Sequence, residues 1–247
     1  MHLTIKGLVL RVSTYHDTDA IVTLLTHSGG KITAKARGLR RKNSPLAAPC
    51  QLLAYSEFTL FENRGLYTIN EAHSLELFYE LRKDLQKLSL GTYFAQVAET
   101  LSQEDAPDPE LLSLVLNCLY ALAKLNTDER LVKAGFELRS ACVSGYTPDL
   151  SGCCHCHKPS AELFDLSEGH LACVSCRNIG PSGIRVPVSP GVLEAMRYLC
   201  YCDSKKLFAF QIGEESLLAI SQISESYLTT QLERSFPTLD FYKTLLI

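Results

Sequence analysis

Four of the ten cysteines have the spacing of metal ligands. Cys153-x-x-Cys156 and Cys173-x-x-Cys176 are separated by sixteen residues, which is enough chain for a small hairpin that returns to the first pair. Paired thiols at this spacing are typical of a tetrahedral zinc site. Because four thiolates fill the shell and leave no position for water, such a zinc stabilises structure and performs no catalysis. The sequence therefore predicts a structural Zn²⁺ bound by these four cysteines.

The exact ligand set stays open, because other donors lie in or beside the two pairs. Each of these could replace a cysteine: Cys154, His155, His157 and His170. A secreted disulfide framework is disfavoured, since the first six residues lack the apolar core of a signal peptide. A redox pair is disfavoured too, since the segment is rich in turn residues such as Pro159 and Gly169. The remaining cysteines are expected to pack as small buried residues: Cys50, Cys118, Cys142, Cys200 and Cys202.

Basic residues form a second candidate site near the N-terminus. Residues 1–82 contain ten Lys or Arg against seven Asp or Glu, a net +3, although the whole chain carries −3. Twelve consecutive residues contain six cations and no acid: Lys31, Lys35, Arg37, Arg40, Arg41 and Lys42. A charge run is often only a solvated face. Here it follows a predicted strand at the rim of a predicted barrel, which favours nucleic-acid binding.

The N-terminal third reads as five short strands, at residues 3–12, 20–26, 31–37, 52–61 and 66–71. Ser28-Gly29-Gly30 supplies a tight turn, and alternation from Lys31 to Arg37 places the basic side chains on one face. Five strands in about 70 residues predict a closed barrel of the OB-fold type. The aromatic candidates for base stacking are Tyr15, His16, Tyr55, Phe58 and Tyr67, although strand aromatics usually belong to the core.

From Ser74 onward, apolar residues recur at three- and four-residue steps, which predicts amphipathic helices. One helix is expected from Asp108-Pro109 to Leu125, and another after Asn126, whose side chain with Glu129 would cap it. Further helices are expected after Ser189-Pro190 and over residues 217–232. The predicted class is α+β, with an OB-fold domain at residues 1–76 and a helical domain at 77–247. The zinc finger would interrupt the helices at about residues 150–182.

Sequence motifs of catalysis are absent. The chain has no Walker-type phosphate loop, nucleophile elbow or His-Glu-x-x-His helix, so we expect no enzymatic activity. Apolar stretches such as residues 111–125 fall short of the roughly 20 needed to cross a bilayer. Two alternatives stay open. One is a zinc-dependent hydrolase in which His155 or His170 replaces a cysteine, and the other is an RNA-binding OB-fold protein.

Taken in order, the barrel, basic loop, helices and four-cysteine finger resemble the RecO family of bacterial recombination mediators, over the whole chain. The resemblance is carried by Lys6–Arg11, Asp19–Thr26, Gly30–Ile32, Ala36–Arg41 and Arg64–Ile69. The chain has Ala36-Arg37-Gly38 where the family usually has Ala-Lys-Gly, so the charge is kept. Relatives often end in a basic stretch, whereas residues 234–240 here are mixed in charge.

The resemblance implies a non-enzymatic protein of the bacterial cytoplasm and nucleoid. Proteins of this kind bind single- and double-stranded DNA, anneal complementary strands, and work with RecR to load RecA onto DNA coated by single-strand-binding protein. A protein that acts on coated DNA is expected to bind the single-strand-binding protein as well as the DNA, because the second contact raises its effective concentration at the site. An apolar groove framed by cations would hold an acidic, hydrophobic tail, and the predicted helix offers Arg130, Lys133 and Arg139 beside Leu131, Phe136 and Leu138.

Overall fold

The computed structural model describes residues 2–125, 127–179 and 183–246, and the chain forms two compact units. The first contains Met1–Leu125 together with Phe236–Ile247, and the second contains Asn126–Ser235. The predicted capping residue Asn126 lies outside the described residues, as do Gly180 and Pro181 of the turn-rich segment around the cysteine pairs. Among the described residues, no helix combines the length and the apolar character needed to cross a membrane.

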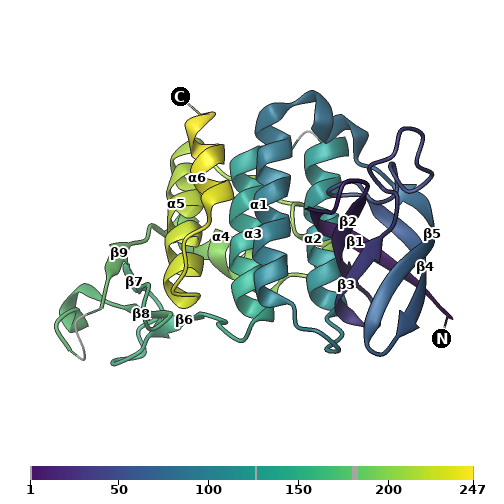
Figure 1. Ribbon diagram of the computed structural model, residues 1–247. Helices are drawn as coiled ribbons and strands as arrows, with labels where there is room; N and C mark the ends of the chain where they lie inside the picture. The colour runs from purple at the N-terminus through teal and green to yellow at the C-terminus, as the bar shows by residue number, and fades with distance from the viewer. Residues whose placement is uncertain (1, 126, 180–182, 247) are drawn as a thin grey trace. The chain divides into compact units, whose positions relative to one another are not determined.

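Five strands close into a barrel in the first unit (Figure 1). Their order around the barrel is β1-β2-β3-β5-β4, with β3 parallel to β5 and the other neighbours antiparallel. This closure confirms the predicted five-stranded OB-type barrel. The bounds are β1 His2–Tyr15, β2 Asp19–Thr26, β3 Gly30–Ala36, β4 Tyr55–Asn63 and β5 Leu66–Glu76.

The barrel closes around side chains that alternate inward along each strand. Along β3, Ile32, Ala34 and Ala36 are buried, while the alternate residues are partly or fully exposed. This period of two is what a strand with one buried face requires. Phe58 is fully buried in the same core, so the idea that it stacks on bases is wrong.

The turn between β2 and β3 lies in close contact with the backbone of residues 103–106. Gly30 has φ +63°, and a Cβ there would come within 2.6 Å of the Gln103 carbonyl oxygen. The Lys31 amide donates to that carbonyl at 2.8 Å, and the Lys31 ammonium donates to the Glu99 carbonyl at 3.1 Å. Only glycine combines this backbone angle with this close approach at low cost.

Helices complete the first unit. Asp84 caps α1, and Asp108 caps α2 with Pro109 at its first position, as predicted. The helical stripe predicted from Ser74 is wrong in its first turns, since β5 continues to Glu76 and a 3₁₀ helix follows. The bounds are Tyr79–Lys83 for that 3₁₀ helix, α1 Leu85–Leu101, α2 Pro109–Lys124 and α6 Pro237–Thr244. α6 packs against α1 and was not predicted.

The described residues of the second unit form the α-helices α3 Glu129–Val143, α4 Pro190–Tyr201 and α5 Glu214–Gln231. α3 packs against both α4 and α5. α4 begins at Pro190 as predicted, and Ser189 caps it by accepting from the Val192 amide at 3.3 Å. The cap of α3 is Asp128, whose carboxylate accepts from the Arg130 amide at 2.9 Å.

A small sheet interrupts these helices between α3 and α4 (Figure 1). Its strand order is β6-β8-β7-β9, and β7 and β8 form the antiparallel hairpin predicted between the two cysteine pairs. The bounds are β6 Asp149–Cys153, β7 Leu163–Asp165, β8 His170–Ala172 and β9 Arg185–Pro187, with single-turn 3₁₀ helices at Val174–Cys176 and Ser204–Lys206.

Candidate metal centre and nucleic-acid interface

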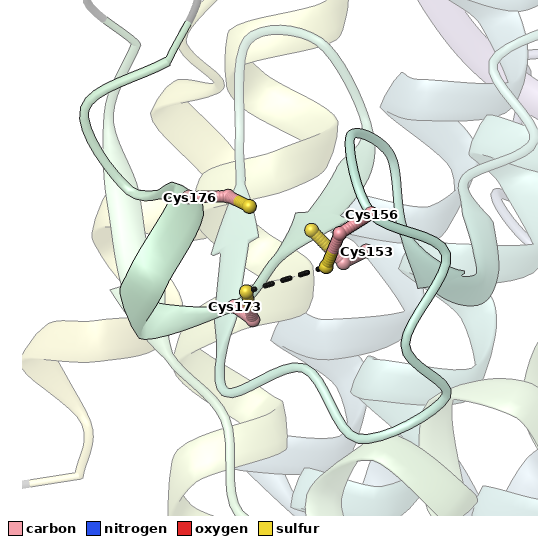
Figure 2. Close-up of side chains that lie close together, drawn as sticks. All are labelled: Cys153, Cys156, Cys173 and Cys176. Atoms are coloured by element: carbon pink, nitrogen blue, oxygen red, sulfur yellow. Dashed lines mark hydrogen bonds between the residues drawn. The ribbon is translucent and has the colours of Figure 1, made fainter.

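The hairpin brings the two cysteine pairs together. Cys153 ends β6 and Cys156 lies in the turn after it, while Cys173 and Cys176 bracket the 3₁₀ helix that follows β8. Figure 2 shows the two pairs facing each other, with the sulfur atoms between the two segments. All four sulfur atoms lie within 4.8 Å of one another.

The sulfur spacing fits a tetrahedral metal site. A Zn–S bond of about 2.3 Å sets the sulfur–sulfur edge of a regular tetrahedron at about 3.8 Å. The Cys156 and Cys173 sulfur atoms are 3.7 Å apart, the contact dashed in Figure 2. A disulfide would need about 2.05 Å, and all ten cysteines are free thiols. The four residues can therefore hold a soft divalent metal, and four sulfur donors favour zinc.

Backbone amides prepare one thiol for metal binding. Burial alone would raise the pKa of the Cys153 thiol, but the amides of Cys156, Cys173 and His155 donate to it and lower its pKa to about 5. In contrast, its hydrogen bond with Cys173 raises the pKa of Cys176 to about 12, with burial adding to the shift. Four thiolates repel one another, and a bound dication would supply the charge that lets them all ionise.

The neighbouring donors do not belong to this group. The cluster comprises the four predicted cysteines, and Cys154, His157 and His170 are not among its members. His155 is occupied elsewhere, since its Nε2 lies 3.0 Å from the Ile179 carbonyl oxygen. The arrangement therefore matches a closed four-sulfur shell and gives no support to a site with an open position for water.

The six predicted cations divide into two groups in the structure. Two belong to β3 and are bound by the chain itself. Lys31 donates to the Glu99 carbonyl oxygen, and Lys35 pairs with Asp19 at 3.0 Å while lying 4.8 Å from the centre of the Tyr15 ring. Both lysines therefore already have a partner within the chain.

The other four cations lie in the loop after β3. Arg37, Arg40, Arg41 and Lys42 are exposed. Arg40 is tied back to the β1–β2 turn, because its guanidinium donates to the Asp17 carbonyl oxygen at 3.3 Å. Among the described residues, no ion pair involves the remaining three.

These three cations line an open cavity of about 460 Å³ between the loop and the N-terminal end of β5. The parallel pairing of Ala36 with Ile69 brings the start of the loop to this end of the strand. None of the described residues that line the cavity is acidic: they are Arg37, Gly38, Arg41, Lys42, Asn43, Ser44, Pro45, Leu46, Thr68, Ile69 and Asn70. Cations and neutral hydrogen-bonding groups without a carboxylate form a suitable surface for phosphate.

Sequence reasoning missed the polar wall of this cavity. Asn43, Ser44, Thr68 and Asn70 carry no charge, and the last two come from a strand about 30 positions after the basic run. Only the parallel closure of the barrel brings them beside the cations. One predicted aromatic does lie near a cation, since Tyr15 is 41% exposed and contacts Lys35.

The apolar groove predicted on the helix of residues 129–143 is wrong. Leu131 is 6% exposed, and Phe136 and Leu138 are fully buried, so these side chains belong to the core of the second unit. The cations beside them also have partners. Arg130 pairs with the carboxylates of Asp128 and Glu214, and Lys133 pairs with those of Glu137 and Glu225. Arg139 donates to the backbone carbonyls of Cys200 and Cys202.

Comparison with known families matches both parts of the chain. The model of the recombination protein O N-terminal domain matches residues 1–78, and that of the recombination protein O C-terminal domain matches residues 82–240. The chain belongs to the RecO family. The curated DNA repair protein RecO of Acetivibrio thermocellus is 32% identical over 99% of this chain and 97% of that protein. RecO of Alkaliphilus metalliredigens is 30% identical over 99% of this chain and 100% of that protein. RecO of Bacillus subtilis is 29% identical over 90% of this chain and 86% of that protein. Membership in the RecO family makes this a protein of DNA repair and recombination.

Proposed function

We propose that this RecO-family protein binds single- and double-stranded DNA through the basic loop of its barrel and anneals complementary strands. With RecR it would help to load RecA onto DNA coated by single-strand-binding protein, in the bacterial cytoplasm at the nucleoid. No covalent bond is made or broken in these steps, so the proposed role is non-enzymatic. Annealing needs a cationic surface that lowers the repulsion between two phosphate backbones.

The observation that carries this proposal is the cavity lined by three cations, with neither an ion pair to these cations nor an acidic lining residue in the part of the chain that the structure describes. Arg37, Arg41 and Lys42 are exposed side by side, and Asn70 and Ser44 add neutral hydrogen-bonding groups. Guanidinium groups match phosphate geometry through two parallel hydrogen bonds, which suits a surface that follows a backbone. We take residues 1–76 as the DNA-binding domain and residues 77–247 as the helical domain that carries the finger.

We further propose that the four cysteines bind structural Zn²⁺. The support is the four-sulfur donor set with one edge of 3.7 Å and its closed shell. Cobalt substitution provides the test, since a four-sulfur shell and a mixed nitrogen–sulfur shell absorb differently. A mixed shell would instead favour the alternative of a zinc site that activates water.

RecR, RecA and the single-strand-binding protein are proposed as partners from family membership. A coat on the DNA competes for the same phosphates, so a protein that also contacts the coat gains effective concentration at its site. The residues of such a contact lie elsewhere than on the buried face of α3.

Annealing of coated strands tests the proposed function directly. Two complementary oligonucleotides, each coated with single-strand-binding protein and each carrying one fluorophore of a transfer pair, are mixed with the protein. We expect energy transfer to rise faster than with the coat alone. Competitor single-stranded RNA of the same sequence should displace the protein less well than DNA. Equal or better competition by RNA, without faster annealing, would support the RNA-binding alternative.

A further inference from the structure

The turn between β1 and β2, together with Asp19 at the start of β2, hydrogen-bonds to the basic loop. One Asp19 carboxylate oxygen accepts from the Gly38 amide at 2.9 Å, and the Thr18 carbonyl accepts from the Arg40 amide at 2.9 Å. The Arg40 guanidinium reaches the Asp17 carbonyl at 3.3 Å. The first of these bonds is made by a side chain, so a substitution can remove it without altering the backbone.

Gly38 is the residue at which the loop changes direction. Its φ of +65° is a left-handed conformation, and a Cβ built there would lie 3.3 Å from the Arg41 side chain. Arg41 thus packs over Gly38, and Arg37 directly precedes it. A bond that fixes the Gly38 amide therefore fixes the starting positions of both arginines that line the cavity.

Asp19 is ionised at neutral pH. The hydrogen bond from Gly38, followed by that from Lys35, lowers the pKa of its carboxyl group to about 2. The bond to Gly38 is therefore charge-assisted, and such bonds are about twice as strong as neutral ones. The second oxygen holds Lys35 at 3.0 Å, so one carboxylate organises both the strand and the loop.

We propose that Asp19 is a positioning residue that holds the basic loop in the conformation that binds nucleic-acid phosphates. This inference rests on the proposed function of the loop. Electrostatics alone gives the opposite expectation, because an acid beside a phosphate site repels the ligand and its removal should tighten binding. Weaker DNA binding after the removal of Asp19 would therefore indicate a positioning role, whereas tighter binding would indicate only charge repulsion.

Three variants of the full-length protein test this sign by binding to fluorescent single-stranded DNA at fixed salt. Asp19→Ala should weaken binding by about tenfold, since fixing the backbone of a freed residue costs about 1–2 kcal/mol. Asp17→Ala is the matched control: it removes the same charge from an exposed side chain in the same turn, and should leave binding unchanged or tighter. Asp19→Asn keeps an acceptor for the Gly38 amide and should lie closer to wild type than to Asp19→Ala.

Amide hydrogen exchange of Gly38 provides a readout that does not depend on Asp19→Ala folding. The wild-type amide should exchange slowly, and Asp19→Asn should retain part of that protection. Fast exchange in the wild type, or Asp19→Ala that is folded and binds as tightly as Asp17→Ala, would overturn the positioning role. Wild-type protein without salt-dependent DNA binding would instead remove the proposed function on which the role rests.

Discussion

The triple variant Arg37→Gln, Arg41→Gln and Lys42→Gln is the sharpest test of the basic loop. These side chains line the cavity and form no ion pair among the described residues. Lys31, Lys35 and Arg40 are left in place because each already bonds to the chain itself. The change therefore removes free cations while keeping the contacts that anchor β3 and the loop.

The expected magnitude follows from the number of cations removed. Each neutralised phosphate contributes about 0.7 to the slope of log affinity against log salt on single strands, and about 0.9 on duplex DNA. Loss of three contacts should lower the slope by about 2.1 on single strands and about 2.7 on duplex. Between about 50 and 200 mM salt, the wild type should lose about 20-fold more affinity for single strands than the variant.

Fluorescence anisotropy of a labelled oligonucleotide over a salt series measures this slope. The control is Lys6→Gln, Lys205→Gln and Lys206→Gln, which has the same change in net charge at exposed sites outside the cavity. Circular dichroism checks that both variants are folded. If the two triple variants show the same slope as the wild type, the basic run is only a solvated face and the loop does not contact phosphate.

Three further predictions concern stability. Cys153→Ser should lose the bound metal and lower the melting temperature, whereas Cys154→Ser should keep both, which metal analysis and calorimetry will check. Lys133→Met should cost about 3–5 kcal/mol, since it removes the ammonium group that pairs with the fully buried Glu137 carboxylate. Burial raises the pKa of Glu137, so proton uptake by this carboxylate offsets part of the loss at low pH, and the loss in urea unfolding should grow as pH rises through that pKa; a loss independent of pH would contradict this. Gly30→Ala should destabilise the barrel unit by about 1–3 kcal/mol in the same assay, because the added Cβ would crowd the Gln103 carbonyl oxygen. An unchanged midpoint of urea unfolding would contradict this crowding.

The metal centre could be predicted because its information is local. Two knuckles of four residues each place their own sulfur atoms, and the sixteen residues between them need only make a hairpin. The same holds for the helix starts at Asp108 and Ser189, whose capping bonds reach only three residues along the chain. In each case the contacts join residues that are close in sequence.

The state of each cation could not be predicted, because it depends on contacts between distant segments. Lys31 is bound by Glu99, 68 positions away, and Lys35 by Asp19. A sequence run gives the number of charges but not which of them already have partners. The predicted groove on α3 was wrong for the same reason: helical spacing identifies an apolar stripe, and only packing decides whether a neighbouring helix covers it.

The helical spacing of the apolar residues from Leu75 to Leu81 predicts a helix that begins near Ser74. In the structure, β5 continues to Glu76 through irregular pairing with β4, and the chain passes through Phe78 at φ +45° before the 3₁₀ helix. Tertiary pairing to β4 thus overrides a short local pattern. Sequence periodicity alone could not locate this boundary between barrel and helices.

The chemistry of the cavity agrees with the proposed annealing role, which has to work on DNA strands of any sequence. A protein that anneals any pair of complementary strands cannot rely on base-edge contacts, since these would favour some sequences over others. Arg37, Arg41 and Lys42 offer charge to phosphates, which are the same at every position of a strand. Binding that is strongly salt-dependent and weakly sequence-dependent is therefore what this surface should give.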